Sequence, residues 1–333
     1  MKQNFLNRRD FISFLYLSLF FLLTGCSNLG KKVKVSFQTN LLPKVFKDSF
    51  PKEWKSNNLD ISNLKKNNNR KIYSETDFVI LNDGWINKLN FNEFKEMDKS
   101  IFNKLDKRSK DYLNLFQSDQ IKKIFPVGLV PYAVVIKKTN SIDLSKTKSW
   151  DFLLSRELKE KIILPNSPRT VISISNKING GTSLRELRNQ VKIYDDKNAL
   201  NWLLYSEAIV AVVPYTLCYE YLKMDSRLTI VFPEEGVPLN WYFILQRSNI
   251  SQEILFEWFN LLQEKSRVFK LMEKGWYLPF SSEYIKDKYK DNNLSKRIKS
   301  PSKICWENSW SLGPIDYKRN MILENISNNS STP

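Results

Sequence analysis

The chain has 333 residues, of which 42% are hydrophobic and 13% aromatic, so it is long enough and apolar enough for two ordinary domains with sizeable cores. Its formal charge is +17, but the basic residues are spread along the chain, which predicts a solvated basic surface and no nucleic-acid partner. The absence of histidine excludes the commonest metal ligand, the commonest general base and every catalytic triad that needs one.

The first 25 residues have the three parts of a secretory signal. A basic region precedes an apolar run from Phe11 to Leu23, and small residues follow the run. The run is shorter than the roughly 20 residues that a transmembrane helix needs. We therefore predict that residues 1–25 are an export signal, and the adjacent Arg8 and Arg9 resemble a twin-arginine export motif.

The segment Leu23-Thr24-Gly25-Cys26 resembles the lipobox of bacterial lipoproteins. In that family the cysteine thiol receives a diacylglyceryl group, and the signal is cut before the cysteine. Each buried acyl CH₂ contributes about 0.8 kcal/mol to membrane attachment. The resemblance implies lipidation of Cys26, a tether over residues 26–32 and a periplasmic body anchored to a membrane. The alternative is an ordinary buried cysteine after a signal anchor.

Short apolar runs in the rest of the chain predict strands. Val33–Thr39 alternates apolar and polar residues, which is typical of a half-buried strand, whereas the Lys/Asn-rich segment Lys52–Lys71 predicts mostly loop. Continuous apolar runs are typical of strands buried on both faces. They occur at Phe78–Leu81, Ile162–Leu164, Ile209–Val213, Leu228–Phe232 and Tyr242–Leu245.

Helical patterns lie between these runs. Ser183 and Glu186 have the spacing of a capping box, and apolar residues recur at helical spacing over residues 254–262. Shorter helices are predicted at Ala199–Tyr205 and Val268–Met272. Strands that alternate with helices predict an α/β fold with mostly parallel sheets. The polar end, residues 325–333, is expected to be disordered.

The segments at the strand ends carry the groups that orient a small ligand. In open α/β sheets, ligands bind beside the carboxyl ends of the strands. Several of these residues also have a structural alternative: Asp83 could cap a turn, Arg169 could pair with a surface carboxylate, and Trp241 and Tyr242 could be core residues of a strand. Together they predict a site formed by Asp83, Trp85, Ser167, Arg169, Thr170, Tyr215, Asn240, Trp241 and Tyr242.

Several segments carry short motifs in a familiar order. They are Asp77–Trp85, Ser149–Leu154, Leu158–Ile162, Leu164–Val171, Phe232–Gly236 with Trp241-Tyr242, and Gly275–Pro279. In this order they resemble the periplasmic solute-binding proteins of the spermidine/putrescine type, which serve ABC importers. The resemblance spans roughly residues 33–285, and its individual motifs are short.

This resemblance implies a type II periplasmic-binding-protein-like fold, in which two α/β lobes joined by a hinge close around a ligand. It implies one lobe from residues 33–130 and 247–300, a second from residues 131–246, and a C-terminal extension over residues 301–333. We expect a monomeric solute-binding lipoprotein that hands a small molecule to an ABC permease. We expect no cofactor, no metal and no catalytic residue, because nothing resembles a nucleophile with its base.

The sequence departs from the polyamine-binding pattern at the ligand positions. Ser167 and Thr170 stand in the loop where diamine-binding members carry carboxylates, and the uncharged Tyr242 falls near another acidic position. A dication buried without carboxylates is poorly compensated. Arg169 and the excess of basic over acidic residues therefore suit an anionic or zwitterionic ligand at least as well as a polyamine.

Two other functions remain open. A ferric-ion binder of the same fold would use the tyrosines at 215, 219 and 221. A non-transport envelope lipoprotein would have kept the fold and lost the ligand.

An oxidising compartment would also permit Cys218 and Cys305 to pair, provided that their Cα atoms come within reach.

Overall fold

The computed structural model describes eight segments of the chain. They are residues 32–38, 41–59, 76–86, 88–139, 143–179, 184–247, 252–280 and 300–314. The predicted export signal, Cys26, Ser183 and the polar C-terminus lie outside these segments. Within them, no helix is both long enough and apolar enough to cross a membrane.

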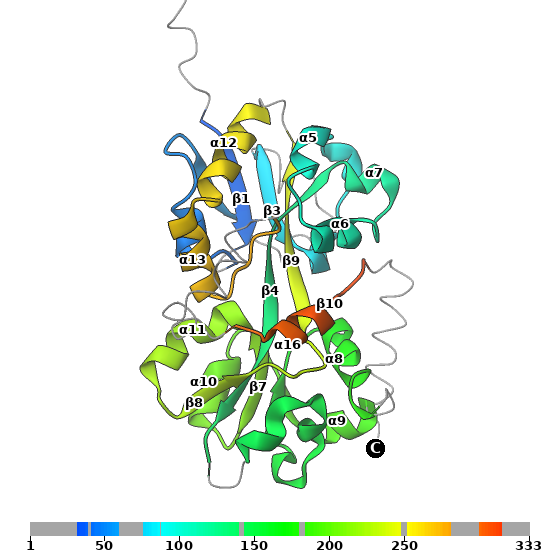
Figure 1. Cartoon of the computed structure of the whole chain (residues 1–333), viewed down its shortest axis with the longest axis vertical. Helices are drawn as coiled ribbons and strands as arrows, with labels where there is room; N and C mark the ends of the chain where they lie inside the picture. The colour runs from blue at the N-terminus through cyan, green and yellow to red at the C-terminus, as the bar shows by residue number, and fades with distance from the viewer. Residues whose placement is uncertain are drawn as a thin grey trace, which may run out of the picture.

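Two groups of parallel strands form the centres of two lobes (Figure 1). In each group a middle strand has one neighbour on either side, and both neighbours run parallel to it. The strands are β1 (Lys34–Gln38), β2 (Lys55–Leu59) and β3 (Phe78–Asn82) in the first lobe, and β5 (Ile162–Leu164), β6 (Val191–Tyr194) and β7 (Val210–Pro214) in the second.

Two long strands run through the junction and connect the lobes. β4 (Ile124–Lys137) and β9 (Pro238–Gln246) pair antiparallel, with a register shift between Pro126 and Gly128. β9 then pairs antiparallel with β3 in the first lobe, and β4 pairs antiparallel with β7 and β8 (Leu228–Val231) in the second. The strand order β2-β1-β3-β9-β4-β7-β5-β6 therefore passes through both lobes, and a hinge motion would have to bend β4 and β9.

Helices cover the strands of each lobe (Figure 1). The first lobe carries α2 (Lys44–Lys47), α4 (Asp83–Ile86), α5 (Lys99–Phe102), α6 (Lys107–Leu113), α7 (Ser118–Ile121), α12 (Gln252–Leu262) and α13 (Lys265–Glu273). The second carries α8 (Pro168–Ser175), α9 (Leu184–Asn189), α10 (Ala199–Tyr205) and α11 (Tyr215–Met224). Short 3₁₀ turns lie at Phe91–Glu93, Leu144–Lys148, Trp150–Leu154 and Arg156–Leu158.

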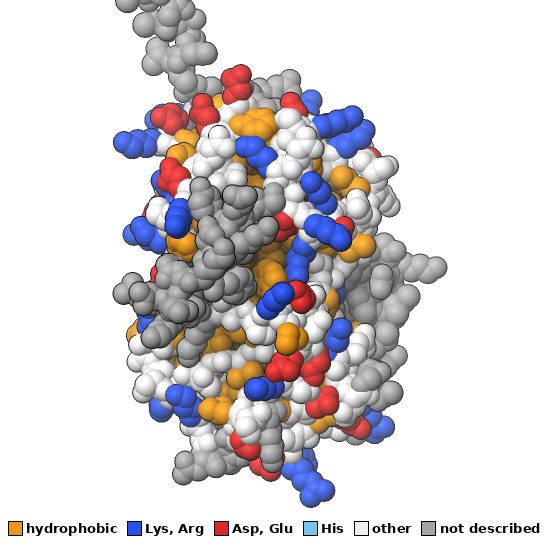
Figure 2. All heavy atoms as spheres, in the orientation of Figure 1, with side chains coloured by type: hydrophobic (Ala, Val, Ile, Leu, Met, Phe, Trp, Pro, Cys, Tyr) orange, Lys and Arg blue, Asp and Glu red, His pale blue; other side chains and the backbone are white. Residues whose placement is uncertain are grey.

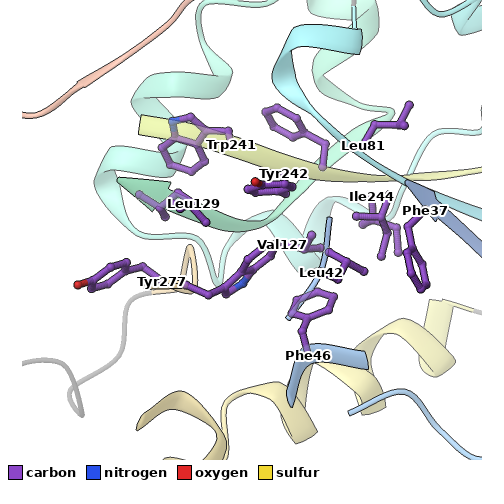
Figure 3. Packing of buried hydrophobic residues seen from close by; sticks show 14 of the residues in the cluster. Phe37, Leu42, Phe46, Leu81, Val127, Leu129, Trp241, Tyr242, Ile244 and Tyr277 are labelled. Atoms are coloured by element: carbon purple, nitrogen blue, oxygen red, sulfur yellow. The ribbon is translucent and has the colours of Figure 1, made fainter. Parts of the chain in front are cut away.

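The core lies against both faces of the connecting strands. Every residue of β4 except Lys137 is buried, as expected for a strand with helices on both sides. Successive residues of β9 point to opposite faces. In Figure 3, Tyr242 and Ile244 point toward Phe46 of α2, while Trp241 lies on the other face of the strand. Full burial of one such apolar side chain contributes about 1.5–3 kcal/mol.

Charged side chains are dispersed over the surface. Figure 2 shows Lys and Arg side chains scattered over the visible face, with Asp and Glu side chains among them. No large area of that face is covered by basic side chains alone. The charge of +17 is therefore distributed on this face as the sequence predicted.

The chain returns to the junction of the lobes near its C-terminus. α16 (Lys303–Asn308) and β10 (Trp310–Ser311) lie where the two lobes meet (Figure 1). β10 pairs in parallel with β9. Cys305 of α16 is buried in a core cluster of the second lobe, and Arg108 of α6 donates a hydrogen bond to the carbonyl oxygen of Trp306 at 2.6 Å. This segment thus contacts both lobes.

The predicted fold class is confirmed. The five continuous apolar runs predicted as strands form β3, β5, β7, β8 and β9, and Ala199–Tyr205 forms α10 as predicted. β2 lies in a segment predicted to be mostly loop; four of its five residues are exposed at the sheet edge, so no apolar pattern marks it. β4 was not predicted as a strand. Its two prolines lie within a central strand, a position where proline is rare.

The two described cysteines do not form a disulfide. Cys218 and Cys305 are both free and buried, and they belong to different hydrophobic clusters. Burial raises the pKa of the Cys305 thiol to about 11, and it also raises the pKa of Cys218. Both thiols are therefore protonated at neutral pH and act as small apolar side chains.

Replacement of Gly236 by alanine should destabilise the protein. Gly236 has a φ of +89°, and a Cβ there would lie 2.3 Å from the backbone carbonyl of Asn308 in α16. We expect Gly236→Ala to lower the free energy of unfolding by about 2 kcal/mol or more, measured by urea denaturation. Gly313→Ala is the control, because its Cβ would meet only Leu115 Cδ1, at 3.8 Å. Equal stability of the two variants would contradict the close approach of Gly236 to the backbone of Asn308.

Candidate functional site

A buried ion pair joins the two lobes. Asp83 begins α4 directly after β3, and Arg169 lies in the first turn of α8. Nη2 of Arg169 lies 2.8 Å from Oδ1 of Asp83, and the two side chains are 16% and 1% exposed. Both were predicted site residues, and the fold brings them together across 86 positions of sequence.

Local sequence fixes where α8 begins and hence where Arg169 lies. Ser167 is the N-cap residue, its hydroxyl accepts from the backbone amide of Thr170, and Pro168 occupies the first helical turn. The hydroxyl of Thr170 also donates to Ser167 Oγ at 3.1 Å. In the structure, these two predicted site residues therefore shape the start of the helix that carries Arg169.

The carboxylate of Asp83 accepts further hydrogen bonds. The Tyr112 hydroxyl donates to Oδ2 at 2.9 Å, and the backbone amide of Trp241 also donates to the carboxylate. Burial raises the pKa of Asp83, although the nearby guanidinium opposes that rise. Burial is the largest influence on the pKa of Arg169 and acts to lower it, but the charge and hydrogen bond of Asp83, together with Tyr112 and Tyr132, raise that pKa overall. Each charge is thus stabilised by the other in a site with little water.

The C-terminal segment completes this arrangement. Trp241 Nε1 donates to Ser311 Oγ at 2.8 Å, and Arg169 Nη1 donates to the carbonyl oxygen of Gly313 at 3.1 Å. The carbonyl oxygen of Leu312 lies 2.8 Å from the Tyr112 hydroxyl and 3.4 Å from Arg169 Nη1. The rings of Tyr112 and Trp241 stack, with centroids 4.7 Å apart. We call Asp83, Tyr112, Arg169, Trp241 and residues 311–313 the junction cluster.

Tyr242 and Asn240 lie outside the junction cluster. The ring of Tyr242 is on the opposite face of β9 from Trp241, with its centroid 4.5 Å from that of Trp276 (Figure 3). Asn240 Nδ2 donates to the Tyr242 hydroxyl at 2.9 Å. These two predicted site residues pair with each other.

Tyr215 and Trp85 have other neighbours. Tyr215 begins α11 and packs edge-on against Phe232, with centroids 5.6 Å apart. Trp85 is half-buried on α4, and the ammonium of Lys88 lies 4.8 Å from its ring centroid. Of the nine residues predicted to bind ligand, the junction cluster therefore contains Asp83, Arg169 and Trp241.

Sequence reasoning missed Tyr112 and residues 311–313. Tyr112 lies on α6, which follows no strand end, so the rule that located the other residues does not apply to it. Residues 311–313 follow the segments that carry the family resemblance. One signal was present: Trp306 and Trp310 stand in a largely polar tail, and large aromatic side chains in such a segment indicate packing.

A small pocket of about 100 Å³ lies beside the start of α8. It is lined by Pro165, Asn166, Ser167, Pro168, Val171, Ile172, Arg188 and Tyr194. Ser167 is the predicted ligand-binding residue that lines this pocket. Pockets for small molecules usually measure about 300–1,000 Å³, so this pocket is small for a solute site.

The described residues contain no group of three or more Cys, Asp or Glu side chains that could hold a metal ion. The tyrosines of α11 have separate partners. Lys223 and Lys274 lie over the ring of Tyr219, at 4.3 and 4.7 Å, and Tyr221 donates to Asn201 at 3.2 Å. Burial raises the pKa of Tyr215.

The arrangement of two lobes connected by β4 and β9 is that of periplasmic-binding-protein-like folds. No protein-family model matches the sequence. No curated protein matches it either.

Solved structures share this fold. One is the spermidine/putrescine ABC transporter substrate-binding protein PotD from Streptococcus pneumoniae, with a TM-score of 0.63 and 13% identity, covering 90% of this chain and 98% of that chain. The Tp0655 (TpPotD) lipoprotein of Treponema pallidum has a TM-score of 0.59 and 10% identity, covering 88% and 98%. A ferric binding protein from Campylobacter jejuni has a TM-score of 0.58 and 15% identity, covering 90% and 99%. At these identities the likeness shows the fold alone.

Loss of Asp83 should destabilise the protein strongly, because Arg169 would remain buried without its carboxylate. We expect Asp83→Ala to lower the free energy of unfolding by about 3–5 kcal/mol. The double variant Asp83→Ala/Arg169→Met should recover part of that loss, because it removes the unpaired charge. Urea denaturation of both variants and of Arg169→Met gives the coupling energy.

Glu96→Ala is the matched control. Glu96 pairs with Lys122 at 3.5 Å, but both side chains are more than half exposed, at 59% and 52%. Its loss should change stability by less than about 1 kcal/mol. If Asp83→Ala changed stability as little as Glu96→Ala does, the buried pair would not have the importance assigned to it.

Proposed function

We propose that the chain is an extracytoplasmic solute-binding lipoprotein that delivers a small charged solute to an ABC importer. The observation that carries the proposal is the junction cluster. A guanidinium, a carboxylate and two stacked aromatic rings from separate elements converge where the lobes meet. Such groups fix the orientation of a small ligand. The fold shared with a transporter substrate-binding protein and with a lipoprotein supports the same proposal.

The proposed mechanism is closure of the lobes around a solute. We take residues 33–130 with 247–300 as one lobe and residues 131–246 as the other. A solute that contacts both Asp83 and Arg169 would interact with both lobes, so its binding would favour the closed form by its differential contacts. The permease would then recognise that closed form. We keep the nine predicted residues as the proposed ligand-binding set, although only Asp83, Arg169 and Trp241 belong to the junction cluster.

The charges of the junction cluster favour a zwitterionic or anionic solute. Arg169 would bind a carboxylate, and Asp83 would bind an ammonium group. A polyamine is the other candidate class, supported by the fold shared with PotD, a spermidine/putrescine transporter protein. Two or more buried ammonium groups would need more than the single carboxylate that the junction cluster contains.

Membrane attachment is proposed through Cys26. The lipobox resemblance and the apolar run before it support an acylated cysteine, with residues 27–32 as a tether and the body in the periplasm. The dispersed basic side chains give no support for a nucleic-acid partner (Figure 2). An enzyme is not proposed, because no nucleophile with an adjacent base was found in the sequence.

Two alternatives have an observation in their favour. A ferric-ion binder is supported by the fold shared with the Campylobacter protein, and iron titration would then produce a tyrosinate-to-iron absorption band. A non-transport envelope lipoprotein is supported by the junction cluster, whose polar groups bond to one another and to residues 311–313. Such a protein would bind envelope partners and no solute.

A solute screen by thermal unfolding tests the transport proposal. Amino acids, dicarboxylates, spermidine, inorganic anions and ferric citrate would be added to residues 27–333. A true ligand at 100 times its Kd should add about 2.7 kcal/mol of stability and raise the Tm by several degrees. The matched variant Arg169→Met should lose that stabilisation. If no solute in the screen raised the Tm, the transport proposal would be rejected in favour of the non-transport alternative.

Metabolic labelling tests the lipid anchor. Cells that express the full chain with labelled palmitate should incorporate label into the protein, and Cys26→Ser should abolish the incorporation. Cys218→Ser is the matched control: Cys218 is buried, so its replacement should leave the label unchanged. Label that persists in Cys26→Ser would show that this residue is not the acylated one.

A further inference from the structure

Residues 309–313, which we call the strap, cross the junction between the lobes. The backbone amide of Val237 donates to Ser309 Oγ at 3.1 Å, and the amide of Trp310 donates to the carbonyl oxygen of Val237 at 3.1 Å. Trp310 and Ser311 then pair in parallel with Pro238 and Leu239 of β9. The strap thus adds a short strand beside the strand that carries Trp241.

The strap offers oxygen acceptors to donors from separate parts of the fold. Ser311 Oγ accepts from the indole of Trp241 at 2.8 Å, and the Gly313 carbonyl accepts from the guanidinium of Arg169 at 3.1 Å. The Leu312 carbonyl is 2.8 Å from the Tyr112 hydroxyl. Trp241 and Tyr112 are 0% and 2% exposed, so water has little access to these donors.

The Trp241 indole and Nη1 of Arg169 need the acceptors that the strap supplies, because neither donates to the Asp83 carboxylate. Oδ1 of Asp83 already accepts from Arg169 Nη2, and Oδ2 accepts from Tyr112. A buried donor left without an acceptor costs about 1–3 kcal/mol. The indole of Trp241 and Nη1 of Arg169 therefore define a position that suits an oxygen-bearing occupant.

We propose that the strap is a built-in occupant of the solute site, and that the solute which displaces it presents carboxylate or carbonyl oxygens to Arg169 and Trp241. This inference rests on the proposed function only in identifying the junction cluster as the solute site. A polyamine carries donors and no acceptor, so it would leave the same two donors unsatisfied. An amino acid or a dicarboxylate would replace the oxygens of the strap.

Ser309 of the strap is the C-cap residue of α16, and its hydroxyl donates to the Cys305 carbonyl at 2.7 Å, but α16 also has contacts that do not involve the strap. α16 is held separately: Cys305 is buried, the ring of Trp306 lies 4.7 Å from that of Tyr277, and Asn308 Nδ2 donates to the Glu234 carbonyl at 2.8 Å. The strap pairs with β9 over only two residues. A strand this short is a weak element, so it can detach at lower free energy than the core.

Two truncated chains test whether the strap occupies a site. One ends at Asn308 and lacks the strap, and the control ends at Pro314 and keeps it. The amidated peptide Ser-Trp-Ser-Leu-Gly-Pro, which matches residues 309–314, would be titrated into each chain by calorimetry. We expect the peptide to bind the chain that ends at Asn308 and not the control. Binding to neither chain, or equally to both, would overturn the proposal.

The same two chains test the class of solute. Succinate and glutamate should raise the Tm of the chain that ends at Asn308 more than that of the control, because no strap competes. If spermidine alone stabilised the chain, the proposed solute class would be wrong, although a solute-binding role would stand. If the peptide bound but none of the three solutes stabilised the chain, the strap would be supported and the proposed function would be weakened.

A substitution in the intact chain covers the case in which truncation prevents folding. Ser311→Ala removes the acceptor of the Trp241 indole and should weaken the strap. The apparent affinity for succinate should then rise about 2- to 10-fold, the range expected for one hydrogen bond. Ser145→Ala, which is remote in a 3₁₀ turn of the second lobe, is the control. An unchanged affinity in Ser311→Ala would overturn the proposal.

Discussion

The buried contact between Asp83 and Arg169 is the constraint on which the junction of the lobes depends. Each lobe contributes one charge, and neither charge would be tolerated there without the other. The hydroxyl of Tyr112, the backbone of Trp241 and the carbonyl groups of residues 312 and 313 complete the hydrogen bonds. These polar groups lie beside an apolar core that is continuous between the lobes, because one hydrophobic cluster contains residues of both, such as Ile80 and Ala211. The other cluster lies within the second lobe.

The site and the connection between the lobes share a structural element. β9 carries Trp241 toward the junction cluster and Tyr242 toward the core on its other face, and it pairs with β3, β4 and β10. A displacement of Trp241 would therefore move β9, a strand that runs through both lobes. This arrangement gives a physical route by which an occupant of the junction could influence lobe closure, because binding and bending would involve the same strand.

Structures of the same fold share little sequence identity with this chain. For the choice of ligand, the chemistry of the junction cluster is therefore stronger evidence than the shared fold. Proteins described as polyamine-binding and ferric-binding have this architecture, so the fold does not select a ligand. The local chemistry is more selective. One carboxylate is already paired with an arginine, and the remaining donors face oxygens of the chain itself. If the junction cluster is the solute site, as we propose, these donors favour a solute that is rich in hydrogen-bond acceptors.

The sequence by itself determined the elements whose signals are local. Apolar runs located β3, β5, β7, β8 and β9, and strand-end chemistry selected nine residues, of which Asp83, Arg169 and Trp241 belong to the junction cluster. The tertiary structure alone showed that these three residues meet, that Tyr112 joins them and that residues 311–313 lie beside them. It also decided that Tyr242 faces the core and that Ser167 caps a helix. The physical reason is that the junction consists of contacts between residues far apart in sequence. Periodicity and turn chemistry describe neighbours along the chain and carry no information about which strand ends will pack together.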